Sequence, residues 1–285
     1  MKVSVVLPAY NEAENLPGLL PKIYQQLGED AEVIVVDDAS SDETSSVAVK
    51  YGARVLKNPC NMGNGASVKR GIRLASNDIV VLMDADGQHK PNEIIMLIEG
   101  LDKYDMVVGA RPACGHVWYR RIANTFYNML ASYVSGVRIV DLTSGFRAFR
   151  RDKAMKFLYL LPNTFSYPST LTMAFIKAAY PVGFKPINIL PRSKGKSKIN
   201  LLNDGLRFFI IIMKIAVFFS PLKLFLPIAF FFFLTGSGYY IYTFTAYHRF
   251  TNMSALLITT SVIIFMLGLI SEQIANLRME KAEDN

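Results

Sequence analysis

The fold class is decided by two stretches of sequence, VSVVLPAY at residues 3–10 and AEVIVVDD at residues 31–38. Both are short apolar runs rich in β-branched residues, and each leads into a polar turn and an amphipathic segment. This alternation is typical of parallel strands joined by crossover helices. Further strands are expected at residues 79–83 and 106–109. Residues 1–199 are therefore predicted to form an α/β domain.

Helix boundaries can also be read from the sequence. Asn11 followed by Glu14 resembles a capping box, which predicts a helix that runs from there to about Gln26. Gly52 and Gly100 are expected where two later helices end, because glycine is common just after a helix.

Composition limits the setting and the partners of the chain. It has 285 residues, a formal net charge of +8 and two cysteines, Cys60 and Cys114, which fit a reducing compartment and offer no disulfide framework. No zinc-finger, RNA-recognition or basic-helix pattern accompanies the positive charge, so lipid is expected as the partner rather than nucleic acid. Met1 leads almost directly into the first strand, which predicts a cytoplasmic first domain.

The apolar residues are concentrated in the last third of the chain. Residues 222–247 are long enough to cross a hydrocarbon layer of about 30 Å, and residues 254–270 form a shorter second run. They predict an integral membrane protein with a two-helix transmembrane hairpin at residues 221–277. Two spans return the chain to its starting side, so a tail at residues 278–285 is expected in the cytoplasm with the first domain.

The segment before this hairpin has a different pattern. Residues 200–220 carry polar side chains at three-, four- and seven-residue separations on an otherwise apolar helix, which predicts an amphipathic helix at the membrane interface. A third span is the alternative, and Lys214 argues against it. Gly236 and Gly238 are small enough to allow close helix packing, which is consistent with a homo-oligomer or with packing against a partner.

Polar residues follow the expected strands at the point where each ends. In open α/β sheets, ligands gather outside the carboxyl ends of the strands, so these residues are expected to converge on one crevice. VLMDADGQHKP at residues 81–91 places Asp84 and Asp86 one residue apart after an apolar run. Carboxylates so close repel each other unless a cation joins them, and Mg²⁺ or Mn²⁺ takes one or two carboxylates plus phosphate oxygens. The stretch therefore predicts a divalent metal site, with Gln88 as a further ligand or orienting group.

Each of these features also has a purely structural explanation. Acidic pairs are common in solvated turns, and Asp37-Asp38 before Ser40 could cap a helix. NMGNGASVKRG at residues 61–71 either cradles phosphate or only shapes a turn, since it lacks the GxxxxGK[ST] spacing. His89 and His116 have no partner at metal-ligand spacing, so a surface role or a role beside the metal ligands is expected for both.

Taken together, the segments resemble the family 2 glycosyltransferases with the GT-A fold, a Rossmann-like nucleotide-sugar-binding domain. The similarity is to the polyprenyl-phosphate sugar transferases that include dolichol-phosphate mannose synthase, and it covers roughly residues 3–200. It rests on VVLPAYNE, VVDDASSDET, NMGNGASVKRGI, VLMDADGQHKP, GAR, DLTSGFRAFRR and RSKGKSKI. The resemblance implies transfer of one sugar from a UDP- or GDP-hexose to undecaprenyl or dolichyl phosphate at the cytoplasmic membrane face.

The resemblance also assigns site residues. The nucleotide is assigned to Pro8, Tyr10, Glu12, Val36 and Asp38, and the rest of the donor to Asp84, Ala85, Arg111, Arg192 and Lys198. The metal, Mg²⁺ or Mn²⁺, is assigned to Asp84, Asp86 and Gln88. The acceptor phosphate is assigned to Arg121 and Thr125 in WYRRIANT at residues 118–125. Asp86, Arg111 and Arg121 are the residues expected to carry catalysis.

Other functions remain as alternatives. A family 2 transferase acting on another membrane-associated glycan or glycolipid shares the first domain. A processive polysaccharide synthase should show a QxxRW-like segment, and the only tryptophan, Trp118, lies in a different setting. A non-catalytic membrane adaptor should have a degraded metal site, whereas Asp84, Asp86 and Gln88 are all present.

Overall fold

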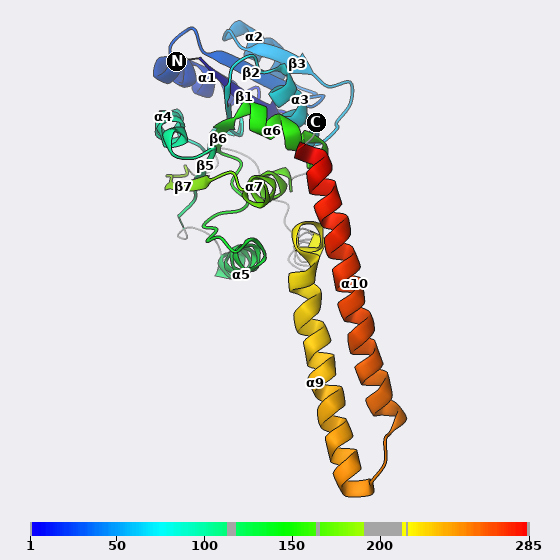
Figure 1. The fold of residues 1–285 in the computed structure, drawn as a ribbon. Coiled ribbons are helices and arrows are strands. Elements are labelled where there is room, and N and C mark those ends of the chain that lie inside the picture. The colour runs from blue at the N-terminus through cyan, green and yellow to red at the C-terminus, as the bar shows by residue number, and fades with distance from the viewer. Residues whose placement is uncertain (1, 113–117, 164–165, 191–212, 215, 284–285) are drawn as a thin grey trace. The chain divides into compact units, whose positions relative to one another are not determined.

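A computed structural model describes the chain except for residues 1, 113–117, 164–165, 191–212, 215 and 284–285 (Figure 1). The chain divides into two compact units. The first comprises residues 1–129 and 137–205, and the second comprises residues 130–136 and 206–285.

The first unit is built around a seven-stranded sheet with the order β3-β2-β1-β4-β6-β5-β7. The strands are β1 (Val3–Ala9), β2 (Glu32–Asp37), β3 (Arg54–Lys57), β4 (Ile79–Leu82), β5 (Met106–Ala110), β6 (Arg147–Arg150) and β7 (Val182–Pro186). Neighbouring strands are parallel except that β6 is antiparallel to β4 and β5. The predicted α/β class is confirmed. Because β6 runs backwards, the residues before it reach the edge where the other strands end.

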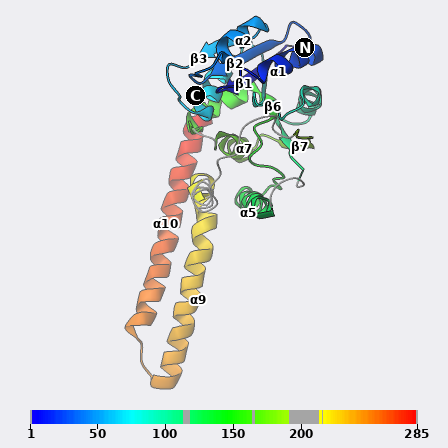
Figure 2. The same cartoon turned by 180° about the vertical axis from the view of Figure 1, so that it is seen from behind.

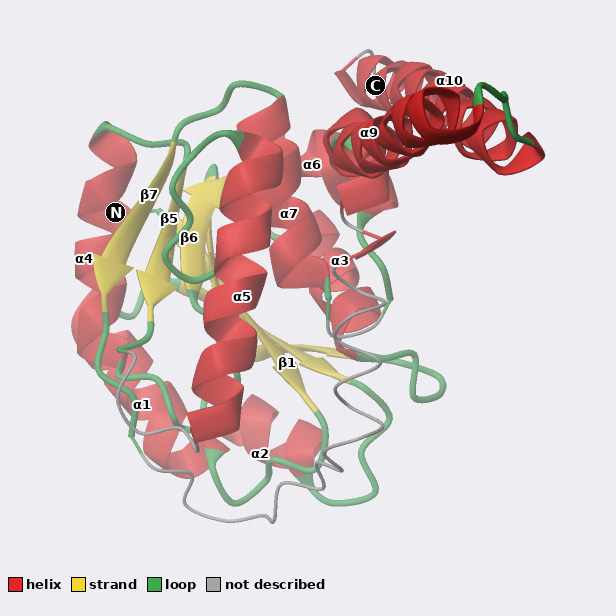
Figure 3. Cartoon of the chain, turned by 90° about the horizontal axis from the view of Figure 1, so that it is seen from below, coloured by secondary structure: helices red, strands yellow, loops and turns green. Residues whose placement is uncertain are grey.

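Helices cover both faces of this sheet. They are α1 (Leu16–Leu27), α2 (Thr44–Lys50), α3 (Asn64–Leu74), α4 (Ile94–Glu99), α5 (Trp118–Ser135), α6 (Arg151–Phe157) and α7 (Tyr167–Lys177), with short 3₁₀ helices η1 (Pro91–Glu93), η2 (Gly100–Asp102) and η3 (Leu158–Leu160). Figure 3 shows α1 and α4 on one side of the sheet and α3, α6 and α7 on the other. Val5 and Leu7 of β1 pack in one core with α1, whereas Val6 faces α3. This follows from the alternation of side chains along a strand.

Close packing of α3 on the sheet depends on Gly71. A Cβ atom built at Gly71 would lie 2.3 Å from Val6 Cγ1 and 3.1 Å from Val36 Cγ2. We expect Gly71→Ala to destabilise the first unit by about 1–3 kcal/mol, because both valines are buried strand residues with little room to move.

Thermal unfolding of the full chain, followed by circular dichroism, measures this effect. Gly18→Ala on α1 is the matched control, since nothing lies within 4 Å of a Cβ atom built there. Equal melting temperatures for the two variants would contradict the packing argument.

The start of α1 differs from the sequence prediction. The residue before the helix is Asn15, and Asn11 lies outside it with a left-handed backbone (φ 57°). Asn11 Oδ1 instead accepts a hydrogen bond from the Ser41 amide at 2.8 Å, which ties the loop after β1 to the loop after β2. The predicted capping box of Asn11 and Glu14 is therefore wrong, because the asparagine side chain is used between loops.

The two glycines expected at helix ends serve different purposes. Gly52 follows α2 with φ 83°, a conformation that favours glycine. Gly100 does follow α4, but its φ of −64° is open to any residue. A Cβ atom at Gly100 would lie 2.7 Å from Val107 Cγ2, so the position requires glycine for packing against β5.

The second unit contains two long helices, α9 (Pro221–Tyr247) and α10 (Asn252–Glu283), which lie side by side as a hairpin (Figures 1 and 2). Both are long and apolar enough to cross a membrane. In the most apolar 18-residue stretch of each helix, only 11% (α9) and 17% (α10) is buried inside the structure. The core helix of a soluble protein would be mostly buried. α10 continues into the predicted tail at residues 278–283. Of the predicted interfacial helix, residues 213–214 and 216–219 are helical, and the stretch before them lies outside the described residues.

Small residues bring α9 and α10 close together. A Cβ atom built at Gly236 would lie 3.0 Å from Leu257 Cβ, and one at Gly268 would lie 2.8 Å from Phe225 Cβ. Gly236 is thus used inside the hairpin, whereas a Cβ atom at Gly238 would meet nothing within 4 Å. Self-association through these glycines stays a prediction.

Candidate active site

The predicted polar residues lie at one edge of the sheet, where the parallel strands end. Ala9 pairs with Asp37 and Val6 pairs with Leu82, so the loops that follow β1, β2 and β4 begin side by side. The loop after β1 is also bonded to the start of α2, where the Glu12 amide donates to Thr44 Oγ1 at 2.9 Å. The first domain therefore has a polar edge built from loops that are distant in sequence.

The acidic loop after β4 has a compact geometry. Ala85 is 2% exposed and belongs to the core under the sheet edge, whereas the flanking Asp84 and Asp86 are partly exposed. Asp86 Oδ1 accepts a hydrogen bond from the Gln88 amide at 3.1 Å. Gly87 between them has φ 71°, which favours glycine. The turn therefore holds Asp86 and Gln88 together.

The Asp84 carboxylate sits in a space left by Gly145. A Cβ atom on Gly145 would lie 2.9 Å from Asp84 Oδ2 and 3.3 Å from the Tyr167 hydroxyl. His89 Nε2 lies 3.8 Å from Asp84 Oδ2. Gly145 comes from the segment before β6, so the reversed strand supplies one wall of this space.

The donor atoms of this loop fit a hard divalent cation. Two carboxylates and an amide oxygen are the ligand types that Mg²⁺ accepts, and Mg²⁺ commonly takes its other ligands from water and substrate phosphates. Within the part of the chain that the structure describes, no three His, Cys, Asp or Glu side chains converge. A cation bound here would thus need oxygens from a substrate as well as those of the protein.

Arg111, directly after β5, is held by a residue that the sequence prediction did not include. Its Nε donates to Asp141 Oδ2 at 2.7 Å and its Nη2 donates to Asp141 Oδ1 at 2.9 Å, while Nη2 also reaches Thr143 Oγ1. Burial alone would raise the pKa of Asp141, but the hydrogen bonds and charge of Arg111 hold it below its ordinary value. Burial alone would lower the pKa of Arg111, but the hydrogen bonds and charge of Asp141 hold the pKa of Arg111 above its ordinary value. Arg111 is therefore a fixed cation at the polar edge.

Asp38 is buried and organises the glycine-rich turn. Its Oδ1 accepts hydrogen bonds from Asn58 Nδ2 at 2.6 Å and the Met62 amide at 2.9 Å, and its Oδ2 accepts one from the Gly63 amide at 2.9 Å. Asp37 accepts from the Ser40 amide, which lies before α2, and from the Ser45 hydroxyl, so it ties the loop after β2 to α2 without capping the helix. A direct contact of Asp38 with a nucleotide stays a prediction.

The other residues assigned to the nucleotide-sugar donor differ in how exposed they are. Tyr10 is 50% exposed at the edge, and Pro8 is half-buried. Val36 is completely buried with its side chain toward Gly71, which leaves only its main chain for a ligand. Arg192 and Lys198 lie outside the described residues.

The predicted acceptor residues lie on α5. Thr125 is exposed, and Arg121 belongs to the same helix, but its side chain lies outside the described residues. The Tyr127 hydroxyl donates to Ser169 Oγ at 2.8 Å, and burial raises the pKa of Tyr127 to about 12. The Leu142 amide donates to Asn128 Oδ1 at 3.1 Å. These contacts anchor α5 to α7 and to the segment that carries Asp141.

Arg147 is another residue that the sequence prediction missed. It is completely buried, and its Nη1 donates to the Pro168 carbonyl at 2.8 Å and to Thr172 Oγ1 at 3.0 Å, while Nη2 donates to the Ser144 carbonyl. Burial lowers the pKa of Arg147 to about 10. Arg147 and Asp141 both lie in DLTSGFRAFRR, but only an antiparallel β6 would have indicated that this motif returns to the polar edge.

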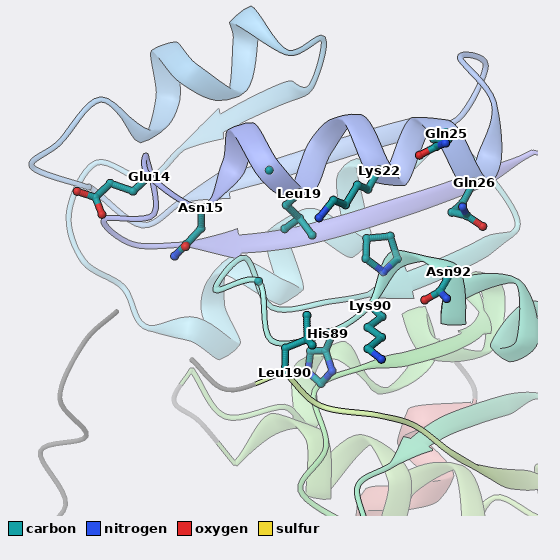
Figure 4. Close-up of a pocket in the computed structure, with 13 residues that line it drawn as sticks. Glu14, Asn15, Leu19, Lys22, Gln25, Gln26, His89, Lys90, Asn92 and Leu190 are labelled. Carbon is teal, nitrogen blue, oxygen red and sulfur yellow. The ribbon is translucent and has the colours of Figure 1, made fainter. Parts of the chain in front are cut away.

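A cavity of about 530 Å³ is bordered by Gly87 of the acidic loop (Figure 4). Leu19 and Lys22 line it from α1, Asn15 lines it from just before that helix, and His89 and Lys90 line it from the loop after β4. His89 thus lies between this cavity and Asp84.

The chain is similar in sequence to two bacterial sugar transferases. The chain is 32% identical to an undecaprenyl-phosphate 4-deoxy-4-formamido-L-arabinose transferase of Enterobacter sp. (strain 638), over 71% of this chain and 66% of that protein. It is 34% identical to the protein of the same name from Serratia proteamaculans (strain 568), over 59% of this chain and 58% of that protein. The chain thus spans less than two thirds of the length of these relatives.

Solved structures with a similar fold include glucosyl-3-phosphoglycerate synthase from Mycobacterium tuberculosis. The TM-score is 0.62 at 20% identity, covering 75% of this chain and 80% of that chain. The fold is therefore shared with glycosyltransferase structures.

Two family models match the chain. The GtrB C-terminal hairpin model matches residues 220–277, which include α9 and most of α10. The glycosyl transferase family 2 model matches residues 4–158, from β1 through the polar edge to α6. Since this match covers more than half of the 285 residues, the chain belongs to glycosyl transferase family 2.

Proposed function

We propose that this chain transfers a single sugar from a nucleotide diphosphate sugar to a polyprenyl phosphate. One observation carries the proposal: a family 2 domain with Asp84 and Asp86 at its polar edge is followed by two helices long and apolar enough to cross a membrane. An enzyme with a water-soluble acceptor does not need such helices. The two relatives named as undecaprenyl-phosphate sugar transferases support the same acceptor class.

The proposal includes a divalent cation held by Asp84, Asp86 and Gln88. Structures of the mycobacterial synthase with a similar fold contain Mn²⁺ with UDP-glucose or Mg²⁺ with UDP. When bound, Mg²⁺ or Mn²⁺ would offset negative charge on the departing nucleoside diphosphate. Arg111, already oriented by Asp141, supplies a second positive charge for the same diphosphate.

The acceptor needs no general base from the protein. A phosphate monoester has a second pKa near 6, so its attacking oxygen is already mostly ionised at pH 7. The residues of α5 then have to position this oxygen in line with the anomeric carbon, and Thr125 and Arg121 are our candidates. Direct displacement inverts the anomeric centre, so an α-linked donor gives a β-linked lipid product.

The location of the enzyme in the cell follows from the same proposal. The hairpin α9–α10 anchors the chain in a membrane, and the transferase domain lies on the cytoplasmic side, where nucleotide sugars are made. Four of the seven residues of the juxtamembrane segment 192–198 are Lys or Arg, and each of these four is worth about 1 kcal/mol against anionic lipid.

The test supplies the purified full chain with a panel of UDP- and GDP-hexoses, undecaprenyl or dolichyl phosphate, and Mg²⁺ or Mn²⁺. We expect mass spectrometry to detect a lipid heavier by one sugar, NMR to show inversion, and excess chelator to stop the reaction. A water-soluble alcohol in place of the lipid is the control acceptor. Equal glycosylation of that alcohol, or full turnover in chelator, would contradict the proposal, and donor binding that ignores Mn²⁺ would favour the adaptor alternative.

A further inference from the structure

His89 has an environment that packing alone does not explain. The residue is 6% exposed, and its Nδ1 is buried without a hydrogen-bond partner among the described residues. A buried polar atom without a partner costs about 1–3 kcal/mol. An apolar side chain of similar shape would avoid this cost, which points to a use for the imidazole.

The orientation of the ring is fixed on several sides. The ring packs on Phe146 with centroids 4.9 Å apart, and Phe146 is completely buried. The main chain of His89 forms a bridge with Ile189, and the Leu190 amide donates to the Gln88 carbonyl at 2.9 Å. The ring therefore has little freedom to turn away from its neighbours.

The other ring nitrogen faces the acidic loop. His89 Nε2 lies 3.8 Å from Asp84 Oδ2, so a small shift of the carboxylate brings the two into hydrogen-bond range. On another side the carboxylate is limited by Gly145, where even a methyl group would approach Asp84 Oδ2 to 2.9 Å. Asp84 is thus placed between a backbone wall and a fixed imidazole.

We propose that His89 is a positioning residue that donates an Nε2–H hydrogen bond to Asp84 and so orients this carboxylate for a divalent cation. The inference rests on the proposed function, because it needs the metal assigned to Asp84. Partners of this kind, which hydrogen-bond to a metal-ligating carboxylate, typically change metal affinity or activity 10- to 100-fold when they are replaced.

The test measures Mn²⁺ affinity of the full chain by electron paramagnetic resonance in the presence of UDP or GDP, without a sugar donor. His89→Phe keeps the ring and its contact with Phe146 but removes the N–H group. We expect Mn²⁺ binding weaker by about 10- to 100-fold, with a melting temperature that is unchanged or higher because the orphaned nitrogen is gone. His89→Gln, which retains an N–H donor, should recover part of the affinity.

Phe157→Leu is the matched control, since it alters another fully buried aromatic residue, which packs against Phe175. This variant should lose stability without losing Mn²⁺ affinity. The inference alone is overturned if the wild-type chain binds Mn²⁺ and folded His89→Phe and His89→Gln bind it equally well. Failure of the wild-type chain to bind Mn²⁺ with either nucleotide would instead overturn the metal assignment of the proposed function.

Discussion

Asp86→Ala is expected to abolish turnover while the fold stays intact. Asp86 is partly exposed, and the hydrogen bond that it accepts from the Gln88 amide lies within the turn, so little of the core depends on it. Its loss removes one of two carboxylates proposed to hold the cation. Loss of such electrostatic stabilisation typically costs about 10²- to 10³-fold in kcat.

The measurement is the rate of lipid glycosylation at saturating nucleotide sugar, together with a circular dichroism spectrum. Asp102→Ala is the matched control, because it removes an exposed carboxylate from η2, outside the polar edge, and should retain full activity. Undiminished activity of the Asp86 variant would remove the metal assignment.

Asp141→Ala is expected to have the largest combined effect on stability and activity. Asp141 makes a bidentate pair with Arg111, and the side chains of the two are only 10% and 25% exposed. Removing one partner of a buried ion pair leaves the other charge uncompensated, which costs up to about 3–5 kcal/mol. Arg111 also loses its orientation toward the proposed diphosphate, so we expect a higher KM for the nucleotide sugar as well.

Chemical denaturation and steady-state kinetics measure these two effects separately. Arg54→Met is the control, since Arg54 forms a more exposed pair with Glu32, of a kind worth about 0–1 kcal/mol. If the Asp141 variant were no less stable than this control, the pair with Arg111 would not be important for the fold.

The pair also predicts a pH dependence. Arg111 holds the pKa of Asp141 below its ordinary value, so the stabilisation is present above the ordinary pKa of about 3.9 and is lost as the pH falls through the lower folded pKa. The stability difference between wild type and Asp141→Asn should therefore be constant near neutral pH and shrink in acid below about pH 4. A difference that grows in acid would contradict the assignment.

The sequence by itself determined the features that depend on local patterns. The β-branched runs at residues 3–10 and 31–38 became β1 and β2, because a strand buried on both faces needs apolar residues at consecutive positions. The two apolar runs of the last third of the chain became α9 and α10, because a helix that crosses a hydrocarbon layer needs about 20 apolar residues in a row. The position of Asp84 and Asp86 at the sheet edge followed from their place directly after a strand.

Only the tertiary structure decided which residues face one another at that edge. Arg111 meets Asp141 across 30 positions of sequence, and Gly145 reaches Asp84 because β6 runs antiparallel to β4. Asn11 bonds to the next loop rather than to its own helix. These contacts depend on where the chain reverses and on which strands become neighbours. The order of the strands is set by packing across the whole sheet, and no local sequence pattern determines it.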